Sequence, residues 1–188
     1  MAATVVDELY TKFQTDPSVC IAYFYCNFRR PEQSEDLLLG LLKQLVQDQS
    51  SIPDPVKDIH NRYKKSPRRP SVEEISRVLQ VVASLSTKVF IVVDALDEIR
   101  ARSVRTSFLS KIFDLQAKTN VSLFATSRFI PEISQMFENS VTLEIRASDE
   151  DVRRYLDGSM SQLPSFVQNF PDLEEGIQTA ITKVVDGM

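Results

Sequence analysis

The feature that most constrains the fold of this chain is a short apolar run at residues 89–93, Val-Phe-Ile-Val-Val. Its length and its β-branched residues are typical of a strand that is buried on both faces of a parallel sheet. Asp94 follows the run directly, and Asp97 and Glu98 come three and four residues later. Because ligands of open α/β sheets bind at the carboxyl ends of the strands, the run predicts a group of acids at a ligand-binding edge.

These acids have the chemistry of one half of a nucleotide-binding site. A carboxylate at Asp94 can direct Mg²⁺ toward phosphates, and Asp97 and Glu98 are near enough to hold the metal's water shell or orient a hydrolytic water. The pattern is that of a Walker B motif. The Walker A loop that usually completes such a site, Gly-x-x-x-x-Gly-Lys-Ser/Thr, does not occur in the sequence. The plainer alternative is that the three acids only end the strand and start the next helix.

Strands and helices alternate along the rest of the chain. Apolar runs at 19–26 and 121–125 predict two further strands, and alternation at 141–145 predicts a strand with one covered face. Such alternation predicts an α/β fold with a mostly parallel sheet. Segments with helical spacing or helix-start signals lie at 2–13, at 34–49, from 71 onward, at 103–118, from 148 onward and from 171 to about 187.

Two serines are predicted to cap helices. Ser34 precedes two acids that favour a helix N-terminus, and Ser71-x-x-Glu74 has the spacing of a capping box. Residues 50–70 contain four prolines, so they are predicted to be irregular with at most one short helix.

Composition limits the classes of partner. A net charge of −4 with both signs interspersed favours neither nucleic acid nor an acidic membrane. No apolar run approaches the ~20 residues of a membrane span. The single histidine, His60, excludes a histidine-based metal site or triad, and Cys20 and Cys26 are expected to be reduced core thiols, as in the cytosol. One basic cluster is interpreted as a solvated loop, in preference to a nucleic-acid site: Lys57, Arg62, Lys64, Lys65, Arg68 and Arg69.

The run at 89–98 and several other stretches together resemble a known family. VFIVVDALDE at 89–98, FATSR at 124–128 and LEIRASDEDVRRYL at 143–156 resemble, in this order, the NACHT-type STAND NTPases. The nearest likeness is to the large fungal group related to NOD-like receptors and heterokaryon-incompatibility proteins. Residues 23–45 and 181–188 also resemble that group, so the likeness covers nearly the whole chain.

The resemblance implies a three-layer P-loop NTPase-like α/β domain at residues 1–147, followed by the start of a helical arm at 148–188. The domain would be incomplete, because the family's first strand and P-loop come just before the helix that matches 2–13. The resemblance thus implies a chain clipped at both ends. It also implies that Asp94 directs Mg²⁺, whereas Asp97 and Glu98 polarise water.

Arg128 resembles the family's arginine that reaches the terminal phosphate, with Thr126 and Ser127 shaping the end of its strand. With no nucleotide bound, Arg128 is expected to pair with Asp94 or Asp97. Ala95 departs from the glycine of many family members, although fungal members often carry alanine. The absent P-loop is the larger departure, because its backbone N–H groups and lysine supply most of the phosphate binding.

The implied function of the intact protein is a cytoplasmic, nucleotide-controlled signalling switch that hydrolyses ATP or GTP slowly with Mg²⁺. Its partners would be the nucleotide and, through effector domains and sensor repeats outside this chain, signalling proteins or further copies. The chain alone is expected to bind no nucleotide tightly, and whether it is an enzyme stays open. The alternative is a degenerate, non-catalytic remnant that acts as an interaction module.

The resemblance also predicts a gap in the sheet. The family's first strand lies between the strands that match 121–125 and 141–145. Without that strand, residues 141–145 are expected to detach, to pair directly with 121–125, or to leave an open slot. Residues 19–26, 89–93 and 121–125 should still form a contiguous parallel sheet with 89–93 in the middle.

Overall fold

The computed structural model describes residues 1–29, 33–47, 49, 51–146, 148–160, 163, 167 and 170–185, and the statements below concern these residues. The chain divides into two compact units, Met1–Met136 and Phe137–Met188. Residue 147 is not among the described residues, so the domain boundary predicted between residues 147 and 148 stays a prediction. The same holds for the end of the last helix near Gly187.

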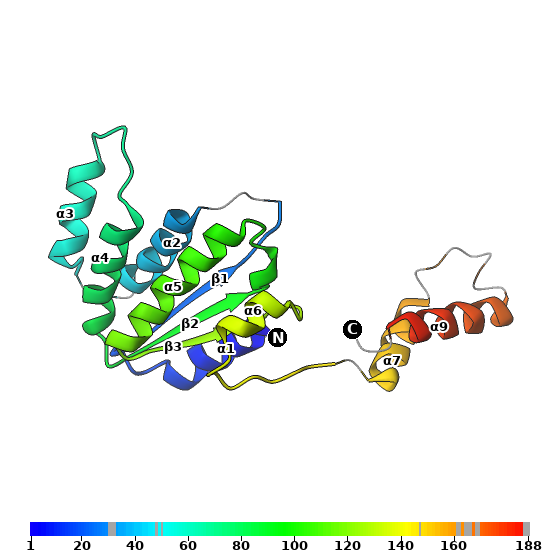
Figure 1. Ribbon diagram of the computed structural model, residues 1–188. Coiled ribbons are helices and arrows are strands. Elements are labelled where there is room, and N and C mark those ends of the chain that lie inside the picture. The colour runs from blue at the N-terminus through cyan, green and yellow to red at the C-terminus, as the bar shows by residue number, and fades with distance from the viewer. Residues whose placement is uncertain are drawn as a thin grey trace. The chain divides into compact units, whose positions relative to one another are not determined.

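A parallel three-stranded sheet forms the centre of the first unit (Figure 1). Its strands are β1 (Val19–Tyr25), β2 (Lys88–Asp94) and β3 (Val121–Ala125), in the order β1-β2-β3. The register pairs Tyr25 with Asp94 and Val93 with Ala125, so the three carboxyl ends lie at the same edge. The prediction of a contiguous parallel sheet with 89–93 in the middle is confirmed.

Helix α1 (Ala2–Phe13) covers one face of the sheet. Its buried Ala2 and Val6 pack against Val92 of β2, and burying such side chains is the main favourable term in folding. The sequence predicted this helix, and its formation rules out residues 2–13 as an additional strand.

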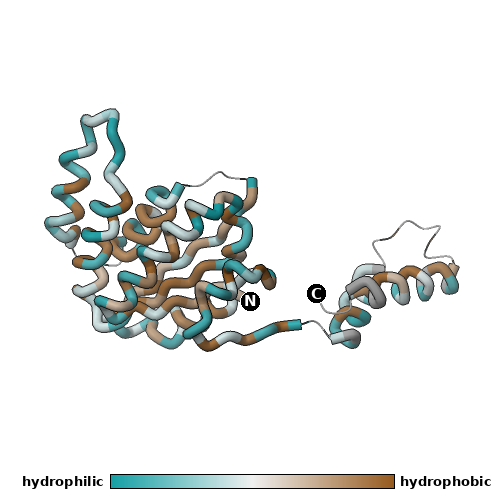
Figure 2. The backbone as a smooth tube through the Cα atoms, viewed as in Figure 1, coloured by the Kyte–Doolittle hydropathy of each residue, from teal (hydrophilic) through white to brown (hydrophobic). Residues whose placement is uncertain are grey.

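The opposite face carries α2 (Ser34–Gln47) and α5 (Arg102–Lys118), and α4 (Val72–Ser84) packs against both. Gly40 of α2 lies beside the ring of Phe24 in β1, where an added Cβ would make ordinary van der Waals contact. Helices therefore cover both faces of the sheet, which makes three layers. Figure 2 shows hydrophobic residues concentrated in the strands and on the helix faces turned toward them.

The predicted capping role of Ser34 is wrong. Ser34 is the first residue of α2 and is buried, and its hydroxyl donates to the carbonyl of Val104 at 3.2 Å. The backbone carbonyl of Gln33 accepts the first N–H groups of the helix instead, from Asp36 and Leu37. The hydroxyl thus joins α2 to the start of α5, a tertiary contact that local sequence does not reveal.

Residues 51–71 contain one helix, as the sequence allowed. This helix, α3 (Asp54–Tyr63), starts after Pro53 and ends before a connecting segment that leads to α4. The predicted capping box of α4 is present, since Ser71 Oγ accepts from Glu74 N at 3.3 Å and Glu74 Oε2 accepts from Ser71 N at 3.0 Å.

The predicted strand at residues 141–145 is not formed. The segment has no regular secondary structure, and its apolar residues Val141, Leu143 and Ile145 are exposed. Of the three expected outcomes, detachment is therefore the one observed. Among the described residues β3 has a strand on one side only, which leaves its other edge without a ladder partner.

In the described part of the second unit, α7 (Asp149–Met160) and α9 (Pro171–Val185) pack on each other. Gln178 Nε2 donates to Asp157 Oδ1 at 2.8 Å across this pair. Within the described part of the chain, no helix is both long and apolar enough to cross a bilayer.

Candidate functional site

The candidate site lies at the carboxyl ends of the three strands. The chain leaves β2 at Asp94, turns at Ala95 and forms a short 3-10 helix, η1 (Leu96–Glu98). The backbone N–H of Leu96 donates to the carbonyl of Thr126 at 2.8 Å, and the N–H of Thr126 donates to Val93 at 2.9 Å. These bonds join the end of β2 to the end of β3.

Asp94 is held by Thr126. The hydroxyl of Thr126 donates to Asp94 Oδ1 at 2.6 Å and accepts from the backbone N–H of Ala95 at 2.9 Å. The threonine thereby fixes both the carboxylate and the turn that follows it. A half-buried carboxylate in a fixed orientation is suited to direct a hard cation such as Mg²⁺.

Ala95 gives this turn an unusual backbone. Its φ of 54° and ψ of 49° place it in the left-handed region, and no other described non-glycine residue has a positive φ. That region costs an alanine roughly 1–2 kcal/mol relative to the right-handed region and is free of this cost for glycine. A glycine at this position would therefore have a backbone advantage over alanine.

Asp97 is paired with Arg128, one of the two pairings that the sequence predicted. Asp97 Oδ2 lies 2.6 Å from Arg128 Nε, and Asp97 Oδ1 accepts from the backbone N–H of Arg128 at 3.1 Å. The Asp97 side chain is 4% exposed, whereas that of Arg128 is 82% exposed. Burial raises the pKa of Asp97, but the hydrogen bonds from the side chain and backbone of Arg128 outweigh it and hold the pKa below its usual value. The same contact raises the pKa of Arg128.

Glu98 points to a different neighbour. Its Oε2 accepts from the backbone N–H of Phe28, in the loop after β1, at 3.1 Å. The guanidinium groups of Arg29 and Arg100 each lie 5.4 Å from the centre of the Phe28 ring. The sequence analysis missed Phe28 and Arg100 because nothing local shows that these two loops meet.

Two further groups lie near Asp94. The pKa of Tyr25 is raised, first by loss of solvent around its hydroxyl and then by its neighbours, Tyr23 and the carboxylates of Asp94 and Asp7. Asp7 belongs to α1, so this helix brings an acid toward the same edge of the sheet. The sequence pattern predicted that Asp7 is on a helix, but it did not predict that Asp7 lies near Tyr25.

The six predicted site residues thus gather at one edge but do not form one cluster. Asp94 contacts Thr126, Asp97 contacts Arg128, Glu98 contacts a loop, and the hydroxyl of Ser127 donates to the carbonyl of Arg128. Within the described residues, no three His, Cys, Asp or Glu side chains are arranged to hold a metal ion. A metal here would need a single carboxylate supplemented by water and phosphate oxygens, which is how Mg²⁺ is usually bound.

Surface depressions lie elsewhere. One, of about 390 Å³, is between α4 and α5, where its lining includes Glu73, Arg77, Lys111 and Asp114. A second of about 390 Å³ is lined by residues that include Ser86 and Asn120, near the amino ends of β2 and β3. Neither contains a predicted site residue.

Comparison with models of known protein families identifies the family of this chain. The model of the nephrocystin 3 N-terminal family matches residues 1–128, which include all three strands and each of the six predicted site residues. Searches of curated proteins and of solved structures found no match. Because the family model covers more than half of the 188 residues, the chain belongs to the nephrocystin 3 N-terminal family.

Proposed function

We propose that this chain is part of a NACHT-type, nucleotide-controlled STAND switch that binds ATP or GTP with Mg²⁺ at the carboxyl edge of the sheet. The observation that carries the proposal is the joining of β2 and β3 at that edge by two acid-based pairs, Asp94 with Thr126 and Asp97 with Arg128. Each acid is thereby held at the edge where open α/β sheets bind ligands.

The chain's own residues fit one half of such a site. Asp94 would direct Mg²⁺, which neutralises phosphate charge when bound. Asp97 and Glu98 would hold or polarise the attacking water after their present bonds, to Arg128 and to the N–H of Phe28, have broken. Arg128, whose exposed guanidinium suits bidentate phosphate contact, would have to leave Asp97 to reach a terminal phosphate.

The same residues do not supply the other half. No stretch of the sequence has the glycines, lysine and hydroxyl of a phosphate-cradling loop. No hydrolytic step is therefore assigned to residues 1–188 alone. We infer that a glycine-rich loop from outside these residues would complete the site, and that hydrolysis and switching belong to a protein that carries both halves. Self-association and signalling partners, in the cytoplasm, belong to the same proposal.

A second candidate is a non-catalytic interaction module. The absent loop favours it, because the backbone N–H groups and lysine of that loop supply most of the phosphate binding. The coding sequence upstream of Met1 separates the two candidates. A Gly-x-x-Gly-x-Gly-Lys-Thr stretch in frame supports the switch, whereas a stop codon supports the module.

Calorimetric titration of residues 1–188 with Mg²⁺–ATP, and separately with Mg²⁺–GTP, provides the first test. We expect no binding tighter than a dissociation constant of about 1 mM, or about −4 kcal/mol, because the phosphate cradle is missing. A low-micromolar constant, about −8 kcal/mol, would contradict the division of the site into two halves.

A further inference from the structure

The segment that connects α3 to α4 contains two arginines shortly before an exposed serine, Arg68-Arg69-Pro70-Ser71-Val72. Ser71 has extended backbone angles, φ −74° and ψ 160°, and Arg69 keeps 72% of its side chain exposed although it reaches Asp36 at 2.8 Å. Because carboxylates pair strongly with arginine, a kinase cleft lined with acidic groups would bind arginines two and three residues before the acceptor hydroxyl, which lie on the non-helical side of Ser71.

We propose that Ser71 is a phosphorylation site for an arginine-directed protein kinase, and that phosphate on Ser71 releases α3 from α4. In this reaction Ser71 Oγ forms a bond to the γ-phosphorus of the ATP held by the kinase. The bond between that phosphorus and the β–γ bridging oxygen breaks, ADP leaves, and the hydroxyl proton passes to the catalytic base of the kinase. The proposal does not depend on nucleotide binding by this chain.

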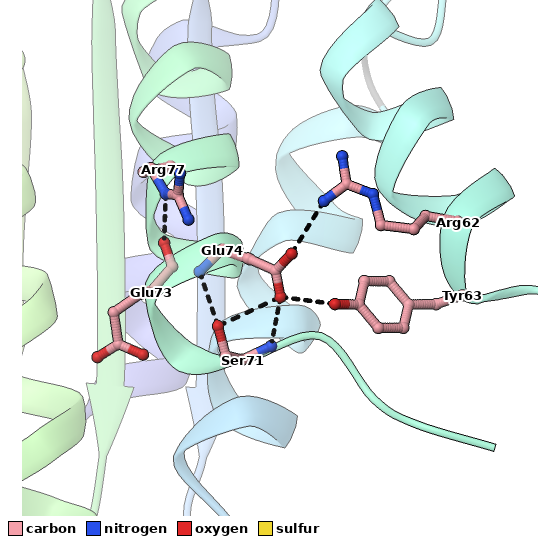
Figure 3. Close-up of polar contacts among 6 residues, drawn as sticks. All are labelled: Arg62, Tyr63, Ser71, Glu73, Glu74 and Arg77. Atoms are coloured by element: carbon pink, nitrogen blue, oxygen red, sulfur yellow. Dashed lines mark hydrogen bonds and ion pairs between the residues drawn. The ribbon is translucent and has the colours of Figure 1, made fainter. Parts of the chain in front are cut away.

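The consequence for α3 follows from a single carboxylate next to Ser71. Figure 3 shows Glu74 at the centre of a hydrogen-bonded cluster that joins the two helices. Glu74 Oε2 accepts from Tyr63 Oη at 2.7 Å, and Oε1 accepts from Arg62 Nη1 at 2.9 Å, both from α3. On the side of α4, the same carboxylate accepts from the N–H and hydroxyl of Ser71, at 3.0 and 3.2 Å.

Glu74 is charged at neutral pH. The hydrogen bond from Tyr63, followed by that from the Ser71 backbone, lowers the pKa of Glu74 from 4.5 to about 2. A phosphate adds about 1.5 to 2 negative charges at neutral pH. A phosphate on Ser71 would lie beside the ionised carboxylate of Glu74. It would also replace the hydroxyl proton that Ser71 now donates to that carboxylate.

Repulsion between the phosphate and Glu74 would therefore disrupt the cluster at its centre. Arg62 gains a stronger acceptor in the phosphate, whereas Tyr63 loses the acceptor of its hydroxyl. A negative group at a helix N-terminus is favourable for the helix itself, so α4 is expected to stay folded. Helix α3 has one buried residue, Ile59, and depends on the cluster more than α4 does.

The first test is phosphorylation of the 188-residue protein by the catalytic subunit of a cyclic-AMP-dependent protein kinase with Mg²⁺–ATP. Mass spectrometry should find one phosphate on Ser71 in the wild type and none at that site in Ser71→Ala. Ser66→Ala is the matched control, because Ser66 lies in the same segment and bonds to the N–H of Arg68 without touching Glu74. It should be modified at Ser71 as fast as the wild type. A wild-type chain that stays unmodified at Ser71 would overturn the site.

The second test compares amide hydrogen exchange in phosphorylated and unphosphorylated wild type. Peptides from α3 should exchange about tenfold faster after phosphorylation, as expected when the charge-assisted bond from Tyr63 to Glu74, worth about 1.5 kcal/mol, is lost. Peptides from the middle of α4 should not change. In Glu74→Gln, which lacks the repelling charge, phosphorylation should accelerate α3 less than it does in the wild type. Equal exchange of α3 in the two wild-type forms would overturn the release.

Discussion

At the residue scale, the two acid pairs at the carboxyl edge differ in their chemistry. Asp94 is bound to a neutral hydroxyl, so its charge stays available to a cation. Asp97 is nearly buried and is neutralised by an arginine whose own side chain is mostly in solvent. The arginine has the freer side chain of the two, but its departure leaves the nearly buried Asp97 carboxylate without a charged partner, which costs free energy. Arg128 is the more movable member of this pair.

The first prediction concerns the pKa of Asp97. Replacing Arg128 with alanine removes the hydrogen bond and the charge that lower this pKa and leaves burial, which raises it. The pKa of Asp97 should therefore rise in Arg128→Ala, as measured by NMR titration of its carboxyl carbon. Arg100→Ala, which removes a guanidinium that stacks on Phe28 in the neighbouring loop, is the control and should leave it unchanged. An unchanged pKa in Arg128→Ala would show that the pair does not persist in solution.

The second prediction concerns pH and Glu74. The pKa of Glu74 is about 2 in the folded chain and is expected near its usual 4.5 when unfolded. A depressed folded pKa stabilises the fold above the unfolded value, and the contribution is lost as pH falls from about 4.5 toward 2. The stability difference between wild type and Glu74→Gln, from urea unfolding, should shrink across this interval. A stability difference that stays constant from pH 5 to pH 2.5 would show that the hydrogen bonds to Glu74 do not persist in solution. Glu73→Gln is the control, because it also removes one carboxylate from α4.

At the scale of elements, the sheet edge explains both what the sequence could predict and where it failed. Strands β1, β2 and β3 each pair with a neighbour, so local pattern and tertiary context agree. Residues 141–145 have an equally clear alternation, yet they stay extended and exposed. A strand needs a partner for its backbone groups, and pattern alone cannot report whether that partner is within reach.

The same reasoning separates the parts of the site that were predictable. Asp94, Asp97 and Arg128 could be placed at one edge because parallel strands bring their carboxyl ends together. Which acid pairs with which group depends on side-chain orientation after the turn at Ala95, and the sequence left both options open. The capping box of Ser71 and Glu74 was predictable because it is local, whereas the bonds from α3 to Glu74 are not.

The third prediction tests the detached segment. Leu143→Pro should change the free energy of unfolding by less than about 0.5 kcal/mol, because proline removes a backbone donor that takes part in no ladder. Ile91→Ala, in the fully buried centre of β2, should cost about 2–5 kcal/mol and serves as the reference for a sheet residue. Chemical denaturation followed by circular dichroism measures both. A loss of more than 1.5 kcal/mol in Leu143→Pro would show that the segment does join a sheet in solution.

At the scale of the whole molecule, the chain combines an α/β unit with a separate helical pair. The α/β unit contains the three strands, the predicted acids and the predicted arginine. All of them lie within the residues that the nephrocystin 3 N-terminal family model matches. It also contains β3, an edge strand with a ladder partner on one side only among the described residues. In the proposed switch, a further strand and a phosphate loop supplied from outside residues 1–188 would account for both the open edge of β3 and the absent loop.

The most direct measurement of the proposed function is Mg²⁺-dependent ATP hydrolysis by a longer protein that carries these residues after a glycine-rich phosphate loop. Asp94→Asn removes the charge that we propose directs Mg²⁺ while nearly preserving shape, so turnover should fall at least about tenfold, equivalent to about 1.4 kcal/mol of barrier. Asp114→Asn, an exposed acid of α5 that lines the depression between α4 and α5, should leave turnover unchanged. Undiminished turnover in a folded Asp94→Asn protein would contradict the assignment of the carboxyl edge as the nucleotide site.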